Sequence, residues 1–387
     1  MTTRAIVIDR LGSPDVLTER EIPLPMPGKG EVRLRVLAAG VNFADLLMRM
    51  GLYGTVPPRP FSPGFEVAGE VEAVGPDSGH EVHPGQRVIA LLRHGGYARR
   101  VVVSAEQVFP WPRGMSSAQA AGFPVIFLTA WVCLFRAGSA RAGERLLVLG
   151  GAGGVGTAAI QLGRRADMRV FATAGTKEKC RYVERELGAE RCLLSGEAWD
   201  REIASVLGSR GIDLILDPVG GRATRRARKL LAPLGRLVFF GLSEAAPGLR
   251  RNWLRAAWAW LRTPRIHPAD LIEPNVGFHG VHLLHLQDRS SILREALAEL
   301  QPAFEDGALR LVLDRTFPLS ATGAAEAHRY LHERRNIGKV VLVAPDGDAQ
   351  PQSGANASGG GSATPVGGAR PRMRISNPQS GPTAEHR

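Results

Sequence analysis

The sequence predicts an α/β protein with a doubly wound parallel sheet, preceded by a second domain of short strands. The apolar run Leu146–Leu149 leads into the spaced glycines Gly151, Gly153 and Gly156 and then into a helical segment. A strand, a glycine turn and a helix in this order form a dinucleotide-binding fingerprint of the Rossmann type. Further apolar runs alternate with helical segments, which is typical of a parallel sheet. These runs are Arg169–Thr173, Cys192–Leu194, Asp213–Asp217 and Arg236–Gly241.

Each glycine of the fingerprint has a separate physical role. Gly151 allows a tight turn, Gly153 lets the backbone approach a pyrophosphate, and Gly156 lets the helix pack closely on the strand. The free N–H groups and the dipole of the helix N-terminus then favour an anionic ligand. The alternative is a glycine-rich loop of an unrelated α/β protein, but the strands that continue the unit favour a nucleotide site.

The end of the second strand favours NADP(H) over NAD(H). A site for NAD usually carries Asp or Glu there, to bind the ribose 2′-hydroxyl. Here Ala174, Gly175 and Thr176 follow the strand, and Lys177 and Lys179 come next. The missing carboxylate removes repulsion of a 2′-phosphate, and the nearby cations attract one. The alternative is an ordinary basic first turn of a helix.

Length and composition limit the class of protein. A chain of 387 residues is long enough for two domains. Its three cysteines include no C-x-x-C pair, which argues against a disulfide framework or a four-cysteine zinc lobe. The N-terminus shows no signal-peptide pattern, and no run of about 18 apolar residues predicts a membrane span. We therefore expect a cytoplasmic protein.

The net charge of +12 is concentrated in one region, because eleven cations and one acid, Glu244, lie between Arg222 and Arg265. Such a region suits nucleic acid, anionic lipid or cofactor phosphates. No nucleic-acid-binding motif accompanies it, so the sequence argues against a DNA or RNA partner.

The segment Arg250–Arg262 within this region holds three of the six tryptophans. On a helix its apolar and basic residues separate onto opposite faces. One hypothesis is peripheral contact with an anionic membrane, or a lid over the substrate. The alternative, which we favour, is a helix that packs on its own domain or across a dimer.

The chain divides into three parts. Residues 1–125 are dense in turns and short strands such as Glu31–Val36, which predicts a partly open β-barrel. Residues 126–285 form the dinucleotide unit, and residues 286–345, with the strand Lys339–Val343, return to the first domain. Residues 346–387 are rich in Gly, Ser, Pro and Ala with few apolar anchors, which predicts a disordered tail.

Several landmarks together resemble the zinc-independent quinone oxidoreductases of the medium-chain dehydrogenase/reductase superfamily, over residues 3–344. In addition to the glycine loop, these landmarks are Ala38–Asp45, Pro63–Gly69, Leu128–Trp131, Asp217–Gly221 and Gly338–Val341. Three further stretches resemble the vesicle amine transport protein branch: Asn42–Tyr53, Arg251–Trp253 and Gly277–His279. The resemblance implies a GroES-like first domain, a homodimer, and hydride transfer from NADPH to a small-molecule quinone or α,β-unsaturated carbonyl.

The resemblance also bears on zinc. Zinc-dependent relatives carry Cys where this chain has Asn42, and a His-Glu pair where it has Phe65–Glu66. A catalytic zinc needs about three protein ligands, so we expect none here. His279, His282 and His285 have a suggestive spacing. On a strand of alternating faces, however, His282 points away from the other two, so we expect no metal cluster there either.

Near the nicotinamide, the resemblance places Asn42, Asp45, Tyr53 and Thr129. Asn42 would donate an amide N–H to a substrate carbonyl, and Tyr53 would stack on a quinone or donate its hydroxyl. Thr129, at the start of a predicted helix, would bind the carboxamide. The alternative for Asn42 and Asp45 is helix capping. No side chain stands out as an obligatory acid, so solvent would supply the protons for quinone reduction.

The remaining contacts that the resemblance implies surround the cofactor. The pyrophosphate would lie against Gly151, Ala152, Gly153, Gly154, Val155 and Gly156. The 2′-phosphate would lie against Gly175, Thr176 and Lys179, and the ribose and nicotinamide against Gly220, Gly241 and Phe278, with Asn336 and Lys339 closing over them. One departure is Ser195, which stands where a tyrosine often contacts the adenosine phosphate.

Two other classes of function remain. A cofactor-binding, membrane-associated or structural protein with little turnover would carry the same motifs. A zinc alcohol dehydrogenase is opposed by Asn42 and Phe65.

Overall fold

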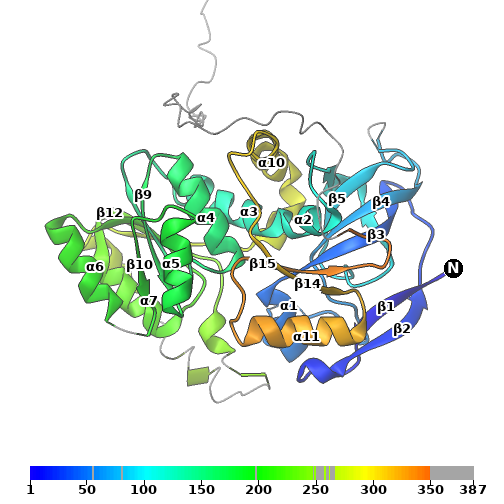
Figure 1. Ribbon diagram of the computed structural model, residues 1–387, viewed down its shortest axis with the longest axis horizontal. Helices are drawn as coiled ribbons and strands as arrows, with labels where there is room; N and C mark the ends of the chain where they lie inside the picture. The colour runs from blue at the N-terminus through cyan, green and yellow to red at the C-terminus, as the bar shows by residue number, and fades with distance from the viewer. Residues whose placement is uncertain are drawn as a thin grey trace, which may run out of the picture.

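The second half of the chain forms a six-stranded parallel sheet in the computed structural model, which describes residues 1–54, 56–79, 82–196, 198–246, 248–249, 257–258, 261 and 266–348. The strands lie in the order β10-β9-β8-β11-β12-β13 (Figure 1). Their bounds are β8 (Arg145–Val148), β9 (Arg169–Ala174), β10 (Arg191–Leu194), β11 (Ile212–Asp217), β12 (Leu231–Phe239) and β13 (Gly277–Gly280). The order reverses between β8 and β11, so the predicted doubly wound sheet is confirmed.

Helices connect these strands and cover the sheet. They are α4 (Gly154–Arg165), α5 (Lys177–Arg185), α6 (Trp199–Leu207) and α7 (Gly221–Ala227). Helix α4 buries Ala158, Ala159 and Leu162. The run Leu146–Leu149 is completely apolar because both faces of its strand are buried.

Strands from residues 1–110 and from residues 313–343 form a mostly antiparallel seven-stranded sheet, the GroES-like domain, and a separate hairpin. The sheet path is β14-β15-β3-β4-β5-β7, with β6 also paired to β3. The strands are β3 (Glu31–Val41), β4 (Glu66–Val74), β5 (Arg87–Leu91), β6 (Arg100–Ser104), β7 (Val108–Pro110), β14 (Leu313–Pro318) and β15 (Lys339–Val343), and the hairpin is β1 (Thr2–Ile8) with β2 (Leu17–Pro23). Because β15 pairs with β3, the end of the chain returns to the first domain.

Two helices of this domain, α1 (Phe43–Met50) and α11 (Ala321–His332), contact each other. The long helical run Ser117–Ala137 contains α2 (Ser117–Gly122) and α3 (Pro124–Trp131) and lies between the two sheets (Figure 1). This run is apolar and long enough to cross a membrane, which the sequence inspection overlooked because polar residues interrupt it. Its apolar window is 83% buried inside the fold, against neighbours that include α4 and α10 (Ser290–Glu305), as expected for a core helix.

Two sequence predictions concern segments that the structure describes only in part. Of Arg250–Arg262, only residues 257, 258 and 261 are described, so the amphipathic helix and its proposed contacts lie outside the described residues. Of the predicted disordered tail, residues 349–387 are likewise not described. The predicted start of disorder at residue 346 is wrong, since Asp346 pairs with Arg35, and Asp348 Oδ1 accepts a hydrogen bond from the Ser117 N–H at 3.0 Å.

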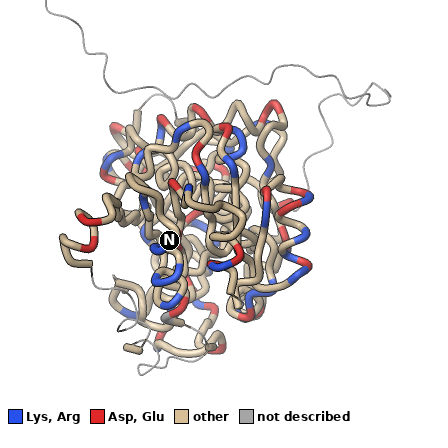
Figure 2. Tube along the Cα trace, turned by 90° about the vertical axis from the view of Figure 1, so that its left-hand side faces the viewer, with Lys and Arg blue, Asp and Glu red and all other residues tan. Residues whose placement is uncertain are grey.

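Two arginines in the described part of the basic region form ion pairs within the fold. Arg236 reaches Glu144 at 2.8 Å, and Arg226 pairs with Asp200. On the face shown in Figure 2, cationic and acidic segments are interspersed along the chain. Two of the described arginines of this region are therefore neutralised by acidic partners.

Candidate functional site

The glycine loop lies at the carboxyl end of β8, beside the switch point of the sheet. The left-handed backbone of its tight turn falls on Gly150, with φ +67°, and not on Gly151 as the sequence analysis expected. A Cβ on Gly151 would come 2.8 Å from the Cβ of Ala172, and a Cβ on Gly156 would come 2.4 Å from the Gly150 oxygen. Glycine at 151 and 156 therefore serves close packing, and α4 begins directly behind this cradle.

A second segment, residues 336–338, lies against the glycine loop. The Gly338 N–H donates to the Ala152 oxygen at 2.8 Å, and Gly153 and Gly338 form a β-bridge. The Asn336 side-chain amide donates to the Gly338 oxygen at 2.7 Å and holds this segment in shape. The structure thus brings Asn336 next to the loop where a cofactor pyrophosphate is expected.

The side chain of Lys179 binds two backbone oxygens of the segment after α11. Its Nζ donates to the Arg334 oxygen at 2.5 Å and to the Asn336 oxygen at 2.8 Å, so two of its three N–H groups hold the adjoining loop. Gly175 and Thr176 are exposed at the end of β9, and the Thr176 hydroxyl caps α5. The exposed cations beside them are Lys177 and Arg181.

A buried polar triad joins β3, β4 and β15. Lys339 Nζ lies 2.6 Å from Glu66 Oε1 and 2.5 Å from Asn42 Oδ1. The Asn42 Nδ2 donates to Glu66 Oε1 at 2.9 Å, and the Val125 N–H donates to Glu66 Oε2 at 2.7 Å. Lys339 is 2% exposed and Glu66 is fully buried. Lys339 therefore does not present its ammonium to an open surface, but orients the Asn42 amide instead.

Asp45 takes the capping role that the sequence left as its alternative. Its carboxylate is buried and accepts the Asn42 N–H at 2.8 Å and the Gly64 N–H at 2.9 Å. Burial raises the pKa of Asp45 to about 7, against the effect of these two N–H donors. The Asp45 carboxylate thus takes part in the capping box that begins α1, and the Asn42 side chain also contacts Glu66 and Lys339.

Thr129 lies inside a helix and not at its start, because α3 already begins at Pro124. It is 7% exposed. The sequence prediction of its position is therefore wrong by one and a half turns, since Pro124 initiates the helix well before the matched motif.

Tyr53 and His282 meet across the two halves of the chain. Tyr53 Oη lies 2.9 Å from His282 Nε2, and the Tyr53 ring lies 5.7 Å from the ring of Phe65. The His282 and His285 rings are 4.2 Å apart. The expected opposite orientation of these histidines is wrong, because β13 ends at Gly280 and Leu283–Arg289 forms a 3₁₀ segment, in which positions three apart share a side.

The sequence reasoning missed His282 as a site residue, although its spacing from His285 was the signal. Within the described ranges, no three His, Cys, Asp or Glu side chains lie close enough together to hold a metal ion.

The other predicted cofactor contacts lie in β13 and in the segments after β11 and β12. Gly220 adopts φ +79°, and its N–H donates to Asp217 Oδ1 at 3.0 Å. A Cβ on Gly241 would come 3.0 Å from the Pro218 oxygen. Phe278 stacks on Phe239 with ring centroids 6.1 Å apart. Gly220 and Gly241 thus lie beyond the carboxyl edge of the sheet that carries the glycine loop.

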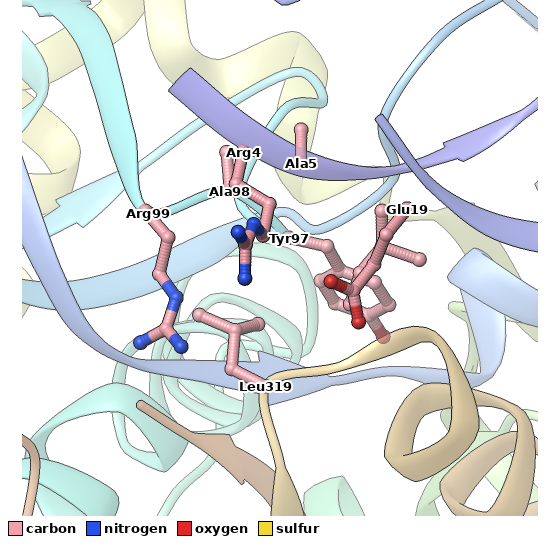
Figure 3. A pocket seen from close by; sticks show the side chains of 8 residues that line it. Arg4, Ala5, Glu19, Tyr97, Ala98, Arg99 and Leu319 are labelled. Carbon is pink, nitrogen blue, oxygen red and sulfur yellow. The ribbon is translucent and has the colours of Figure 1, made fainter. Parts of the chain in front are cut away.

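A small hollow lies elsewhere, in the first domain (Figure 3). Arg4, Glu19, Tyr97 and Arg99 are among the residues that line it. None of the predicted site residues lines this hollow, so it is distinct from the candidate site.

Two family models match the chain. The alcohol dehydrogenase GroES-like domain matches residues 28–113, and the zinc-binding dehydrogenase model matches residues 187–342. The synaptic vesicle membrane protein VAT-1 homolog of Rattus norvegicus is 34% identical over 343 residues, which cover 88% of this chain and 84% of that protein. The chain belongs to the medium-chain dehydrogenase/reductase superfamily. The quinone oxidoreductase of Rattus norvegicus is 29% identical over 344 residues, covering 88% of this chain and 97% of that protein.

Solved structures of this superfamily agree with the fold. The quinone oxidoreductase of Thermus thermophilus, also solved in complex with NADPH, is 38% identical with a TM-score of 0.72, covering 88% of this chain and 99% of that one. The human VAT-1 homolog-like protein is 30% identical with a TM-score of 0.75, covering 89% and 98%. The CurK enoyl reductase is 27% identical with a TM-score of 0.77, covering 89% and 99%. The resemblance predicted from the sequence is confirmed, and the chain has the fold of a superfamily oxidoreductase.

Proposed function

We propose that this protein is an NADPH-dependent reductase that transfers a hydride to a quinone or an α,β-unsaturated carbonyl without zinc. The observation that carries the proposal is the contact between the glycine loop and residues 336–338, because the next residue, Lys339, binds Asn42. Residues 336–339 thereby connect the glycine loop to the polar triad of Asn42, Glu66 and Lys339. Relatives of both substrate types, quinone oxidoreductase and enoyl reductase, share the fold.

The residues of the loop fit a dinucleotide. Gly151 and Gly156 leave no room for a Cβ, and the N-terminus of α4 has no side-chain cap, so its first N–H groups are free for phosphate oxygens. The end of β9 carries no acid, and Lys177 and Arg181 are exposed beside it, which favours NADPH. NADPH supplies the hydride when it is bound, and the protein positions the acceptor and excludes water.

The residues at the usual zinc position do not fit that metal. Asn42 and Phe65 offer neither thiolate nor imidazole, and the one carboxylate, Glu66, is paired with the Lys339 ammonium at 2.6 Å. A zinc ion beside Glu66 would meet a second cation in a buried site. The donor set thus supports a reaction without zinc, although one matching family model bears the name of a zinc-binding dehydrogenase.

The triad has a direct use in carbonyl chemistry. One N–H of the Asn42 amide is bound to Glu66, and the second is left for a substrate oxygen. The Lys339 ammonium at the Asn42 oxygen draws electron density from the amide and makes that N–H a stronger donor. A fixed donor aimed at an oxygen that gains negative charge contributes about 10²-fold or more to a rate.

Steady-state oxidation of NADPH and NADH with a panel of quinones and enones tests this function. We expect turnover with at least one acceptor, a preference for NADPH, and no loss of rate after dialysis against a zinc chelator. Tight NADPH binding without turnover on every acceptor would favour the second candidate, a structural or membrane-associated protein, which the name of the VAT-1 relatives suggests. The cytoplasmic location, the homodimer and the contact of residues 250–262 with anionic lipid remain predictions.

A further inference from the structure

The hydrogen bond between Tyr53 and His282 joins the GroES-like domain to the nucleotide-binding sheet. His282 stands two residues after β13 ends, and the Val281 N–H donates to the Phe239 oxygen at 2.7 Å, which fixes the chain at the carboxyl edge of β12. Parallel sheets of this class bind ligands outside the carboxyl ends of their strands. The Tyr53 hydroxyl is therefore held over the edge of the sheet where a cofactor binds.

Tyr53 also lies close to the polar triad. Its ring packs on Phe65, and the next residue, Glu66, binds Asn42 and Lys339. Tyr53 and Asn42 thus contact successive residues of the chain, Phe65 and Glu66.

We propose that His282 is a positioning residue that orients Tyr53 and resupplies its proton, so that Tyr53 protonates the substrate oxygen during reduction of an α,β-unsaturated carbonyl. This inference rests on the proposed function and names a proton path that the sequence did not suggest. His282 is exposed, so its outer ring nitrogen is open to water while Nε2 faces Tyr53.

Bound NADPH would supply a hydride to the β-carbon, and the C=C π-electrons would move to the α-carbon and the carbonyl oxygen. Tyr53 would then give its hydroxyl proton to that oxygen. The Tyr53 oxygen receives the Nε2 proton of His282 while Nδ1 of the same ring takes a proton from water. The enol that leaves becomes the saturated ketone in solvent, so the net consumption is one hydride and one proton.

The protonation states of both groups suit this path. Burial raises the pKa of Tyr53 to about 12, with a smaller contribution from Asp45, so the hydroxyl keeps its proton at neutral pH. Burial, and secondarily His285, lower the pKa of His282, so its ring is neutral and can accept at one nitrogen while it donates from the other.

The test compares enone reduction by the wild-type protein and by the variants Tyr53→Phe, His282→Ala and His279→Gln. His279 is an exposed histidine of the same strand end, so His279→Gln is the matched control. We expect Tyr53→Phe to lower kcat about 100-fold and His282→Ala about tenfold, with the Kd of NADPH unchanged. Millimolar imidazole should restore part of the rate of His282→Ala only, because the exposed position of the missing ring is open to solvent.

A second measurement needs no turnover. The NMR titration of the His282 ring in the protein alone should shift in Tyr53→Phe, whereas that of His279 should not. Equal rates for His282→Ala and His279→Gln with no response to imidazole would overturn the relay and leave the proposed function intact. Absence of turnover by the wild-type protein on every acceptor would overturn both.

Discussion

Lys339 Nζ lies 2.6 Å from Glu66 Oε1 in the interior of the GroES-like domain. Two opposite charges that are buried away from water stabilise each other. Either charge alone would lower the stability of the fold, because it would be buried without a partner. We expect Lys339→Met to lower the free energy of unfolding by about 3–5 kcal/mol, because Glu66 is then buried without a counter-charge. Urea denaturation measures this loss.

The matched control for this prediction is Lys29→Met, since Lys29 and Asp77 form a pair at 3.1 Å on the surface. An exposed pair contributes about 0–1 kcal/mol, so this variant should unfold almost like the wild-type protein. The double variant Glu66→Gln with Lys339→Met should recover part of the loss. Equal stability of Lys339→Met and Lys29→Met would contradict the role of the buried pair.

The glycine cradle predicts a sharp difference between two Gly→Ala substitutions. Gly156→Ala places a Cβ 2.4 Å from the Gly150 oxygen, so the loop must move, whereas Gly196→Ala meets nothing within 4 Å. We expect Gly156→Ala to weaken NADPH binding by at least about tenfold, or ~1.4 kcal/mol, and Gly196→Ala to leave it unchanged. Fluorescence titration of NADPH checks both, and similar affinities would contradict this account of the loop.

Lys177 and Lys179 should affect the cofactor differently. Lys179 holds residues 334–336 through two carbonyl oxygens, so Lys179→Met should weaken NADPH and NADH by similar factors. Lys177 is exposed beside the end of β9, so Lys177→Met should weaken NADPH alone, by a factor of about 3–10, as the loss of one charge contact implies. The ratio of the two dissociation constants in each variant is the quantity to measure. An unchanged ratio in Lys177→Met would exclude this residue from 2′-phosphate recognition.

His328 predicts a pH dependence of stability. Burial, and then the nearby Arg49 and His332, hold the pKa of His328 well below its ordinary value. Below about pH 6.5 the unfolded chain binds a proton on this histidine, whereas the native state does not. Each unit by which the pH is lowered therefore reduces the free energy of unfolding by about 1.4 kcal/mol. Asp45 acts in the opposite direction between about pH 4 and 7, because its pKa is raised in the native state and the folded protein binds the extra proton.

Comparison of His328→Gln with the wild-type protein isolates the histidine, since Asp45 is present in both. The variant should gain stability relative to the wild-type protein as the pH falls from 6.5, and the difference should be constant above pH 7. Denaturation midpoints across this range measure it. Parallel curves would show that His328 has the same pKa in the native and unfolded states, and would contradict the prediction.

The nucleotide-binding half could be predicted well from the sequence because its signals are local. The run Leu146–Leu149 and the glycines after it determine a strand, a turn and a helix within about 20 residues, and each of these elements is observed. The same local reasoning assigned the tight turn to Gly151, since motif spacing alone does not reveal that Gly150 takes the positive φ.

The polar centre could not be predicted in the same way. Glu66 and Lys339 are joined only because β15 pairs with β3, a contact between distant parts of the chain. The position of His282 depends on β13 ending at Gly280, and a local pattern of histidines does not show where a strand stops. Sequence patterns thus identified Asn42 and Tyr53 themselves, whereas their side-chain partners Glu66 and His282 became apparent only in the tertiary fold.

The placement of β15 has a consequence for how the protein is made. A ribosome delivers β3 and β4 early, yet the strand that carries the counter-charge of Glu66 leaves it only after the whole nucleotide-binding sheet has emerged. Until then the first domain holds an open sheet edge at β3 and an unmatched carboxylate, both of which favour chaperone binding or aggregation. The domain that begins the chain is thus the last to be completed during synthesis.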